Sequence, residues 1–134
     1  MAADEQFYRE YILDHYRNPR NFGRLEEADI THEEYNPFCG DLVGMDFKVS
    51  DGVIQDVRFH GRGCAISQAS ASLMTERLKG MPLEEARGIS KDDVLDELGI
   101  DISPARLKCA LLSLKVLKVG AYGLSGDDES EEEL

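Results

Sequence analysis

The central part of the chain alternates apolar and polar residues with a period of two. Residues 42–50 place an apolar side chain at every second position, and residues 53–59 gather valine and phenylalanine on one face. An Asp-Gly pair lies between these two runs, which is the sequence pattern of a β-hairpin. Residues 30–35 are expected to add a third strand at the edge of the same sheet.

Helical periodicity replaces this alternation on either side of the predicted hairpin. Phe7, Tyr11 and Ile12 recur at helical spacing, so an amphipathic helix is expected over residues 4–16, ended by the Asn-Pro pair that follows. Residues 67–78 are rich in small side chains and are expected to form a second helix. Small side chains allow a helix to lie close to a sheet or a cofactor.

The last third of the chain carries two helix-start signals. Ser90 and Asp93 resemble a capping box, which predicts a helix that reaches about Leu98. Ser103 followed by a proline predicts a last helix that runs to Val119 and ends at the next glycine. We therefore expect one α+β domain, in which a small antiparallel β-sheet of about three strands has α-helices packed on it.

Length and charge then exclude several classes of protein. The chain has 134 residues and a formal net charge of −12, which suits one acidic domain. Phosphate binding needs a basic surface, so a pI near 4.6 argues against a nucleic-acid partner. No apolar run reaches the roughly 18–20 residues that a membrane span needs, and the acidic N-terminus predicts neither a secretory signal nor a transit peptide. We therefore expect a cytoplasmic protein with no nucleic-acid or membrane partner.

The negative charge is concentrated at the C-terminal end. Residues 123–134 contain six acidic residues, no basic residue and no apolar periodicity. Such a segment is expected to be a disordered, solubilising tail, and a docking role is the alternative. This divides the chain into a domain at residues 1–122 and an acidic tail at residues 123–134. The densest basic cluster, at residues 17–24, is either an ordinary loop or a docking surface for a partner.

The three cysteines, Cys39, Cys64 and Cys109, are the main candidates for chemistry. Their odd number, the absence of a C-x-x-C pair and the lack of an export signal argue against disulfides. Burial as ordinary core residues is the structural alternative. Cys39 is expected to face the same point as Asp41, because Gly40 allows the chain to turn between them. Cys64 is expected at a helix N-terminus, whose partial positive charge favours a thiolate.

Cys109 is also expected in a setting that favours a thiolate, because the cation Lys108 precedes it. Three thiolates and Asp41 form a suitable four-coordinate set for zinc, or for the iron of an iron–sulfur cluster. Soft sulfur ligands select such metals over calcium or magnesium. An oxygen ligand exchanges more readily than a fourth thiolate, so this set suggests a site that gives up its cargo.

The three histidines are the competing ligands. His60 lies near Cys64 in the chain, but strand alternation points it away from Phe59 and toward solvent. His15 and His32 are expected to be ordinary surface or helix residues. The cysteines and the aspartate therefore remain the preferred ligand set.

Four segments together resemble a known family. They are residues 14–23 (DHYRNPRNFG), 36–41 (NPFCGD), 61–76 (GRGCAISQASASLMTE) and 105–112 (ARLKCALL). On these segments the chain resembles the U-type iron–sulfur cluster assembly scaffolds, the group of IscU, the NifU N-terminal domain and SufU. The resemblance extends from residue 7 to about residue 122 and implies the α+β fold of that group.

The resemblance also implies ligands and partners. It places Cys39, Asp41, Cys64 and Cys109 on the ligands of a transient [2Fe–2S] cluster, or of Zn²⁺ in the same site. It implies a cysteine desulfurase as the sulfur donor, docked near the loop at residues 17–21, and apo iron–sulfur proteins or carriers as recipients. The implied function is that of a scaffold, not an enzyme, on which the cluster is assembled before its transfer.

Departures from the family pattern leave alternatives open. IscU members have histidine before the third cysteine, where this chain has Lys108 as SufU members do, yet the chain lacks the SufU insertion between Cys64 and Cys109. The segment that IscU presents to an Hsp70 chaperone reads ISPAR at residues 102–106. The second hypothesis is therefore a SufU-like zinc-dependent sulfurtransferase that accepts persulfide sulfur and stimulates a desulfurase, and the third is a structural zinc domain. In the scaffold hypothesis Cys109 is the expected persulfide acceptor, and Lys108 stabilises its thiolate.

Overall fold

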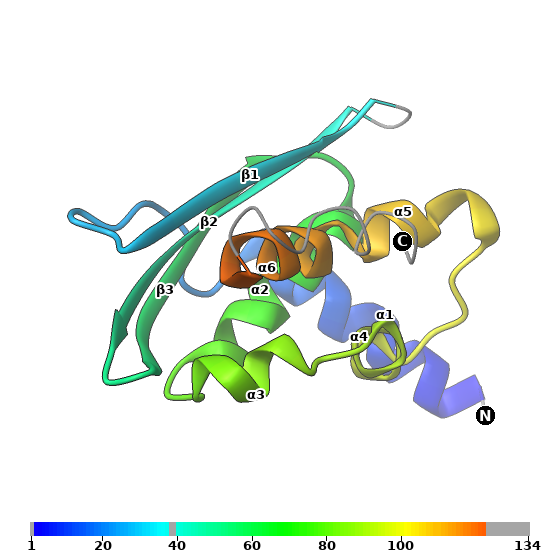
Figure 1. Cartoon of the computed structure of the whole chain (residues 1–134). Helices are drawn as coiled ribbons and strands as arrows, with labels where there is room; N and C mark the ends of the chain where they lie inside the picture. The colour runs from blue at the N-terminus through cyan, green and yellow to red at the C-terminus, as the bar shows by residue number, and fades with distance from the viewer. Residues whose placement is uncertain (1, 38–39, 123–134) are drawn as a thin grey trace.

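A three-stranded antiparallel sheet lies along one side of the protein in the computed structural model, which describes residues 2–37 and 40–122 (Figure 1). The strands are β1 (Ile30–Asn36), β2 (Asp41–Ser50) and β3 (Val53–Arg62), with β2 in the middle. Helices gather on one face of this sheet. They are α1 (Ala2–Arg17), α2 (Ala65–Leu78), α3 (Leu83–Arg87), α4 (Lys91–Leu98), the 3-10 turn η1 (Pro104–Arg106), α5 (Leu107–Ala110) and α6 (Leu112–Tyr122).

The central hairpin forms where the alternating pattern predicts it. β2 and β3 pair antiparallel across a turn at Asp51 and Gly52, whose φ angles are 54° and 75°. A two-residue hairpin turn of this kind needs positive φ at both central residues, which Asp-Gly tolerates well. The predicted edge strand is confirmed as β1, which pairs antiparallel with β2. The predicted fold class, α+β with about three strands, is confirmed.

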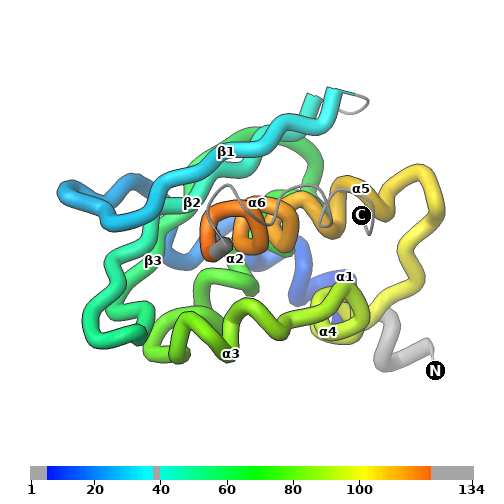
Figure 2. Tube along the Cα trace, in the orientation of Figure 1, coloured from blue at the N-terminus to red at the C-terminus, as the bar shows by residue number. Residues whose placement is uncertain are grey.

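The inner face of the sheet carries the hydrophobic core. Val43, Met45 and Phe47 of β2 are almost fully buried, as are Val57 and Phe59 of β3. α2 and α6 pack on this face, and α1 packs on α2. The tube trace shows α6 running close beneath β1 (Figure 2). The sheet therefore has a covered inner face and an outer face that no described helix covers.

α2 is surrounded by other elements, which explains its small side chains. It contacts the sheet, α1, α4, α5 and α6, and its residues 67–75 are all buried. Protein interiors are close-packed, so serine and alanine fit between these elements where larger residues would not. Several of the buried hydroxyls on this helix hydrogen-bond to neighbouring elements.

The C-terminal helical region differs from the single long helix predicted there. It consists of η1, α5 and α6, because Leu111, with φ of −100° and ψ of 4°, interrupts the helix. The Ser103 side chain makes no capping hydrogen bond. α6 continues past Gly120 to Tyr122. This glycine permits close packing on β1, since a Cβ there would lie 3.3 Å from Cγ2 of Ile30.

The other helices agree more closely with the sequence. α1 and α2 occupy the predicted segments to within two residues. α4 has the predicted capping box, in which the Ser90 hydroxyl accepts from the Asp93 N–H at 3.1 Å and the Asp93 carboxylate accepts from the Ser90 N–H at 2.9 Å. α3 has no counterpart in the prediction. None of the described helices has the length and apolar character that crossing a membrane requires. The predicted acidic tail, residues 123–134, lies outside the described residues.

Two histidines occupy environments that differ from the prediction. His15, expected to be an ordinary surface or helix residue, lies in α1 but is only 1% exposed, because α1 turns it toward α2. His60 lies on the face of β3 opposite Phe59, as predicted, but only 17% of its side chain is exposed. Its ring lies over Gly44 and hydrogen-bonds to Glu33 at 2.6 Å. The absence of a side chain at residue 44 creates the space that the ring fills.

Candidate metal centre

Three of the four predicted ligands come together at one end of the sheet. Asp41 is the first residue of β2, Cys64 directly precedes α2, and Cys109 lies in the short helix α5. One potential ligand atom from each residue lies within 4.8 Å of the other two. The fourth predicted ligand, Cys39, lies outside the described residues. The fold thus joins donors that the sequence places far apart.

Asp41 is fully buried and is held by the backbone of Cys64, the next candidate ligand. Its Oδ1 accepts a hydrogen bond from the main-chain N–H of Cys64 at 2.9 Å. Its Oδ2 lies 3.8 Å from Sγ of Cys64. The first contact fixes the orientation of the carboxylate, and the second oxygen is left facing the thiol.

Two glycines allow the chain before α2 to pass this close to β2. Gly63 has φ of +144°, and a Cβ at this position would lie 2.1 Å from Oδ1 of Asp41. Gly61 has φ of +155°, and a Cβ there would lie 2.1 Å from the carbonyl oxygen of Leu42. Glycines before a candidate ligand permit unusual backbone angles and close approach of another group. In the structure they allow close approach of the protein's own carboxylate and strand.

Cys64 occupies the N-cap position of α2. Its backbone is extended, with φ of −74° and ψ of 165°, and its side chain is half-buried. The unpaired N–H groups of the first helical turn give this end of α2 a partial positive charge, which stabilises negative charge placed beside it. No acidic residue lies in that first turn. The position therefore suits an anionic ligand set, as the sequence predicts.

Cys109 is fully buried and has a donor that the sequence analysis did not single out. The side-chain amide of Asn36 donates toward its sulfur at 3.8 Å. Asn36 is the last residue of β1 and pairs with Asp41 in the sheet, so the donor belongs to the same corner of the fold. Lys108, predicted to stabilise the Cys109 thiolate, is exposed. The position of Asn36 in the segment NPFCGD is the one sequence signal that could have identified it.

The donor set fits zinc or the iron of an iron–sulfur cluster. In a tetrahedral site, thiolate sulfurs lie about 2.3 Å from the zinc ion and therefore slightly less than ~4 Å from one another. The donors of Asp41, Cys64 and Cys109 therefore need only small adjustments to share one ion. Two sulfur donors with one oxygen favour zinc or an iron–sulfur cluster over calcium and magnesium. Among the residues that the structure describes, no histidine belongs to this cluster.

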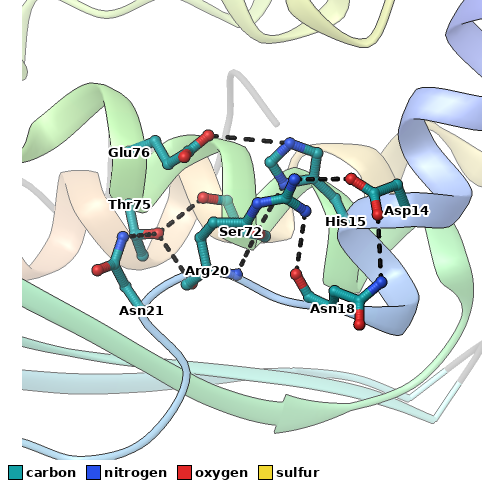
Figure 3. Close-up of polar contacts among 8 residues, drawn as sticks. All are labelled: Asp14, His15, Asn18, Arg20, Asn21, Ser72, Thr75 and Glu76. Atoms are coloured by element: carbon teal, nitrogen blue, oxygen red, sulfur yellow. Dashed lines mark hydrogen bonds and ion pairs between the residues drawn. The ribbon is translucent and has the colours of Figure 1, made fainter.

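The basic loop after α1 is fixed to the other end of α2 (Figure 3). The Ser72 hydroxyl lies 2.7 Å from Nδ1 of His15 and accepts from the main-chain N–H of Arg20 at 2.9 Å. The side-chain amide of Asn21 donates to the Thr75 hydroxyl at 3.1 Å. Burial lowers the pKa of His15, and the cation of Arg20 lowers it further. His15 shares the Ser72 hydroxyl with this loop and does not belong to the candidate metal centre.

Known proteins resemble this chain along most of its length. Residues 7–128 match the family described as the NifU-like N-terminal domain. The chain is 40% identical to the zinc-dependent sulfurtransferase SufU of Bacillus subtilis, with 87% of this chain and 90% of that protein covered. It is 43% identical to the iron–sulfur cluster assembly scaffold protein IscU of Thermotoga maritima, with 85% of this chain and 92% of that protein covered.

A similar fold is present in a crystal structure from Fervidobacterium islandicum. That protein is described as a candidate iron–sulfur cluster assembly scaffold for the SUF system. The two structures superpose with a TM-score of 0.73 at 30% sequence identity, covering 84% of this chain and 94% of the other. The resemblance predicted from the four sequence segments is therefore confirmed at the level of sequence and of fold.

Proposed function

Because the chain belongs to the NifU-like N-terminal domain family, we propose that it is a scaffold for assembly and transfer of an iron–sulfur cluster. The cluster, of the [2Fe–2S] type, is the cargo. A cysteine desulfurase supplies the sulfur, and apo iron–sulfur proteins or carriers receive the product. The observation that carries this proposal is the convergence of Asp41, Cys64 and Cys109 within 4.8 Å. Relatives named as IscU scaffolds support it.

The proposed ligands are Cys39, Asp41, Cys64 and Cys109. Cys39 lies two residues before Asp41 in the chain, which supports its inclusion as the fourth ligand. The Cys64 N–H holds one oxygen of the Asp41 carboxylate, so the other oxygen is presented to the metal. Because an oxygen ligand exchanges more readily than a thiolate, Asp41 is the ligand that opens when the cluster leaves.

Cys109 is the proposed acceptor of sulfur from the desulfurase. Its thiolate attacks the outer sulfur of the persulfide on the partner's cysteine, forms a new S–S bond, and releases that cysteine as a thiolate. No oxidant is needed, because one S–S bond replaces another. Lys108 stabilises the attacking thiolate through its positive charge. Since Cys109 is fully buried, this transfer requires α5 to move when the desulfurase docks.

The basic loop at residues 17–21 is the proposed docking surface for the desulfurase. Arg17 is exposed at the end of α1, and the Arg20 backbone is held by Ser72. A loop that is already ordered loses little conformational entropy when a partner binds. An acidic surface on the desulfurase would complement it. Cysteines used as metal ligands suit a reducing compartment, so we place the protein in the cytoplasm.

Anaerobic reconstitution tests the scaffold proposal. The purified protein is incubated with ferrous iron, cysteine and a desulfurase, and sulfur-to-iron charge-transfer absorbance is expected to appear. Asp41→Ala is expected to alter that absorbance. Mass spectrometry before iron is added is expected to find persulfide on Cys109. Tight zinc binding without retention of any iron would contradict the scaffold proposal.

A zinc-dependent sulfurtransferase is the second candidate. The 40% identity to SufU and Lys108 in place of the histidine typical of IscU favour it. In that case Zn²⁺ would be held by the same residues and would keep the thiolates deprotonated. The protein is then expected to stimulate desulfurase turnover, and removal of zinc with a chelator is expected to abolish the stimulation. Stimulation that persists in the zinc-free protein would contradict this second proposal.

A further inference from the structure

A buried chain of hydroxyl groups connects α2 to the helix that carries Cys109. The Ser70 hydroxyl of α2 donates to the main-chain carbonyl oxygen of Ala110 at 2.8 Å. The Ser113 hydroxyl of α6 lies 3.1 Å from the Ser70 oxygen. Because the Ser70 hydrogen is already used, Ser113 is the donor in that pair. Both serines are buried, so neither hydroxyl is exposed to competition from bulk water.

The Ala110 carbonyl, which accepts the Ser70 hydrogen bond, lies at the end of α5. Ala110 directly follows Cys109, and Leu111, the next residue, interrupts the helix. At Leu111 the backbone departs from regular helical angles, with φ of −100° and ψ of 4°. The Ser70 hydrogen bond supplies a constraint at this point. Fixing the Ala110 carbonyl restricts the orientation of α5, and thereby the position of the neighbouring Cys109.

Ser70 belongs to the same helix whose N-cap is Cys64. Ser70 lies six residues after Cys64 along α2, which is about 9 Å of helix. An α-helix of this length is stiff, so Ser70 moves with the N-cap. The Gln68 side chain of the same helix donates to the carbonyl oxygen of Leu42, next to Asp41, at 3.3 Å. α2 is thus hydrogen-bonded beside both of the other described ligands.

We propose that Ser70 is a positioning residue for the metal centre, which holds Cys109 through the Ala110 carbonyl at the distance from Cys64 that a shared metal requires. The proposal rests on the proposed function in taking Cys64 and Cys109 as ligands. Residues that orient metal ligands without touching the metal typically change its affinity about 10–100-fold when they are replaced. Ser70 is expected to belong to this class.

Ser72 provides a matched control on the same helix. It is also a buried serine of α2 with two hydrogen-bond partners, but these are His15 and Arg20, away from the metal centre. Ser70→Ala and Ser72→Ala therefore remove comparable interactions from the two sides of one helix. A purely structural role would affect both variants alike. A positioning role would lower the zinc affinity of Ser70→Ala and leave that of Ser72→Ala unchanged.

The test uses the full chain in the wild-type, Ser70→Ala and Ser72→Ala forms. Zinc affinity is measured by competition with a chelator, the cobalt(II) complex by its absorption spectrum, and stability by urea unfolding. Ser70→Ala is expected to weaken zinc binding about tenfold and to change the cobalt spectrum, whereas Ser72→Ala changes neither at a similar loss of stability. Equal zinc affinity in all three proteins, or equal weakening in both variants, would overturn the proposal.

A measurement without metal separates this proposal from the proposed function. In the metal-free protein, the alkylation rates of Cys109 and Cys64 are compared by mass spectrometry. Ser70→Ala is expected to accelerate Cys109 relative to Cys64, and Ser72→Ala is expected to leave that ratio unchanged. If wild-type protein bound no metal, the proposed function would fail while this ratio still tested Ser70. If Ser70→Ala did not fold, Ser70→Gly, which also removes the hydroxyl, would replace it, and an unchanged ratio in that variant would contradict the proposal.

Discussion

The main-chain N–H of Cys64 donates a hydrogen bond to Oδ1 of Asp41 at 2.9 Å. The two residues are 23 positions apart, so this bond connects the start of β2 to the start of α2. Because the bond occupies one oxygen, the carboxylate is oriented before a metal arrives. Such preorganisation reduces the conformational entropy that metal binding would otherwise cost.

Asp41→Asn is expected to weaken zinc binding at least about tenfold with little effect on the fold. Asparagine keeps an oxygen that can accept from the Cys64 N–H, but it lacks the charge that attracts a cation. Chelator competition measures the affinity. Asp46→Asn is the control, because Asp46 is also a buried aspartate of β2 but bonds to Arg24 and the Leu25 N–H. Equal zinc loss in the two variants would contradict a ligand role for Asp41.

Gly63→Ala is expected to damage both stability and metal binding. The new Cβ would lie 2.1 Å from Oδ1 of Asp41, so the carboxylate must move and lose its bond to Cys64. Gly80→Ala is the control, since Gly80 also has positive φ, +83°, but open space around it. That variant is expected to cost only the backbone strain of about 1–2 kcal/mol. Urea unfolding and zinc competition check both, and similar results for the two variants would contradict the close approach at Gly63.

Asp46→Asn is expected to lower the free energy of unfolding at pH 7 by about 1–3 kcal/mol. Burial raises the pKa of Asp46, but hydrogen bonds from Arg24, the Leu25 N–H and Thr31 outweigh it, and the net pKa is lowered. The charged form therefore stabilises the fold above a pH of about 4 and is lost below it. Urea unfolding from pH 3 to pH 7 is expected to show that the free energies of unfolding of wild-type and Asp46→Asn protein converge as the pH falls. A constant difference between them across that range would contradict an origin in the charge of Asp46.

His15 is expected to make stability fall as the pH drops below about 6.5. Its pKa is lowered by burial and by Arg20, with Glu76 and Asp14 opposing. The unfolded chain therefore takes up the proton first as the pH falls, which lowers the free energy of unfolding; above pH 6.5 the contribution is fully present. His15→Gln, measured by urea unfolding from pH 5 to pH 8, is expected to remove this slope. If the pH dependence of the free energy of unfolding were unchanged in His15→Gln, another titratable group would be its cause.

The hairpin, and the convergence of three of the four candidate ligands, could be predicted because short sequence segments indicate them. The Asp51-Gly52 pair lies between two runs of alternating apolar and polar residues, a pattern that strongly favours a β-hairpin. Cys64 and Asp41 stand beside glycines in segments typical of their family. These features depend on a few neighbouring residues, which the sequence displays directly.

Two features could not be predicted from local patterns because they depend on tertiary packing. They are the buried face of α1 and the interruption of the last predicted helix. Phe7 belongs to the aromatic stripe of α1 but is 62% exposed, while His15 on the same helix is buried. Ser72 compensates that burial with a hydrogen bond, and serine gives no sign of burial in a sequence. The interruption at Leu111 likewise follows neither proline nor glycine. Beside it, the Ala110 carbonyl of α5 accepts a hydrogen bond from Ser70 of α2, a long-range contact that local patterns do not contain.

The three described donors come from chain positions 41, 64 and 109, so a metal shared by them would act as a removable cross-link. Closing two loops of this length restricts the unfolded chain, as disulfides do, by an amount that grows slowly with loop length. The loaded protein would then resist unfolding more than the empty one, by about 4 kcal/mol when free metal exceeds its dissociation constant a thousandfold. Delivery of the cargo would therefore leave the empty protein less stable than the loaded one.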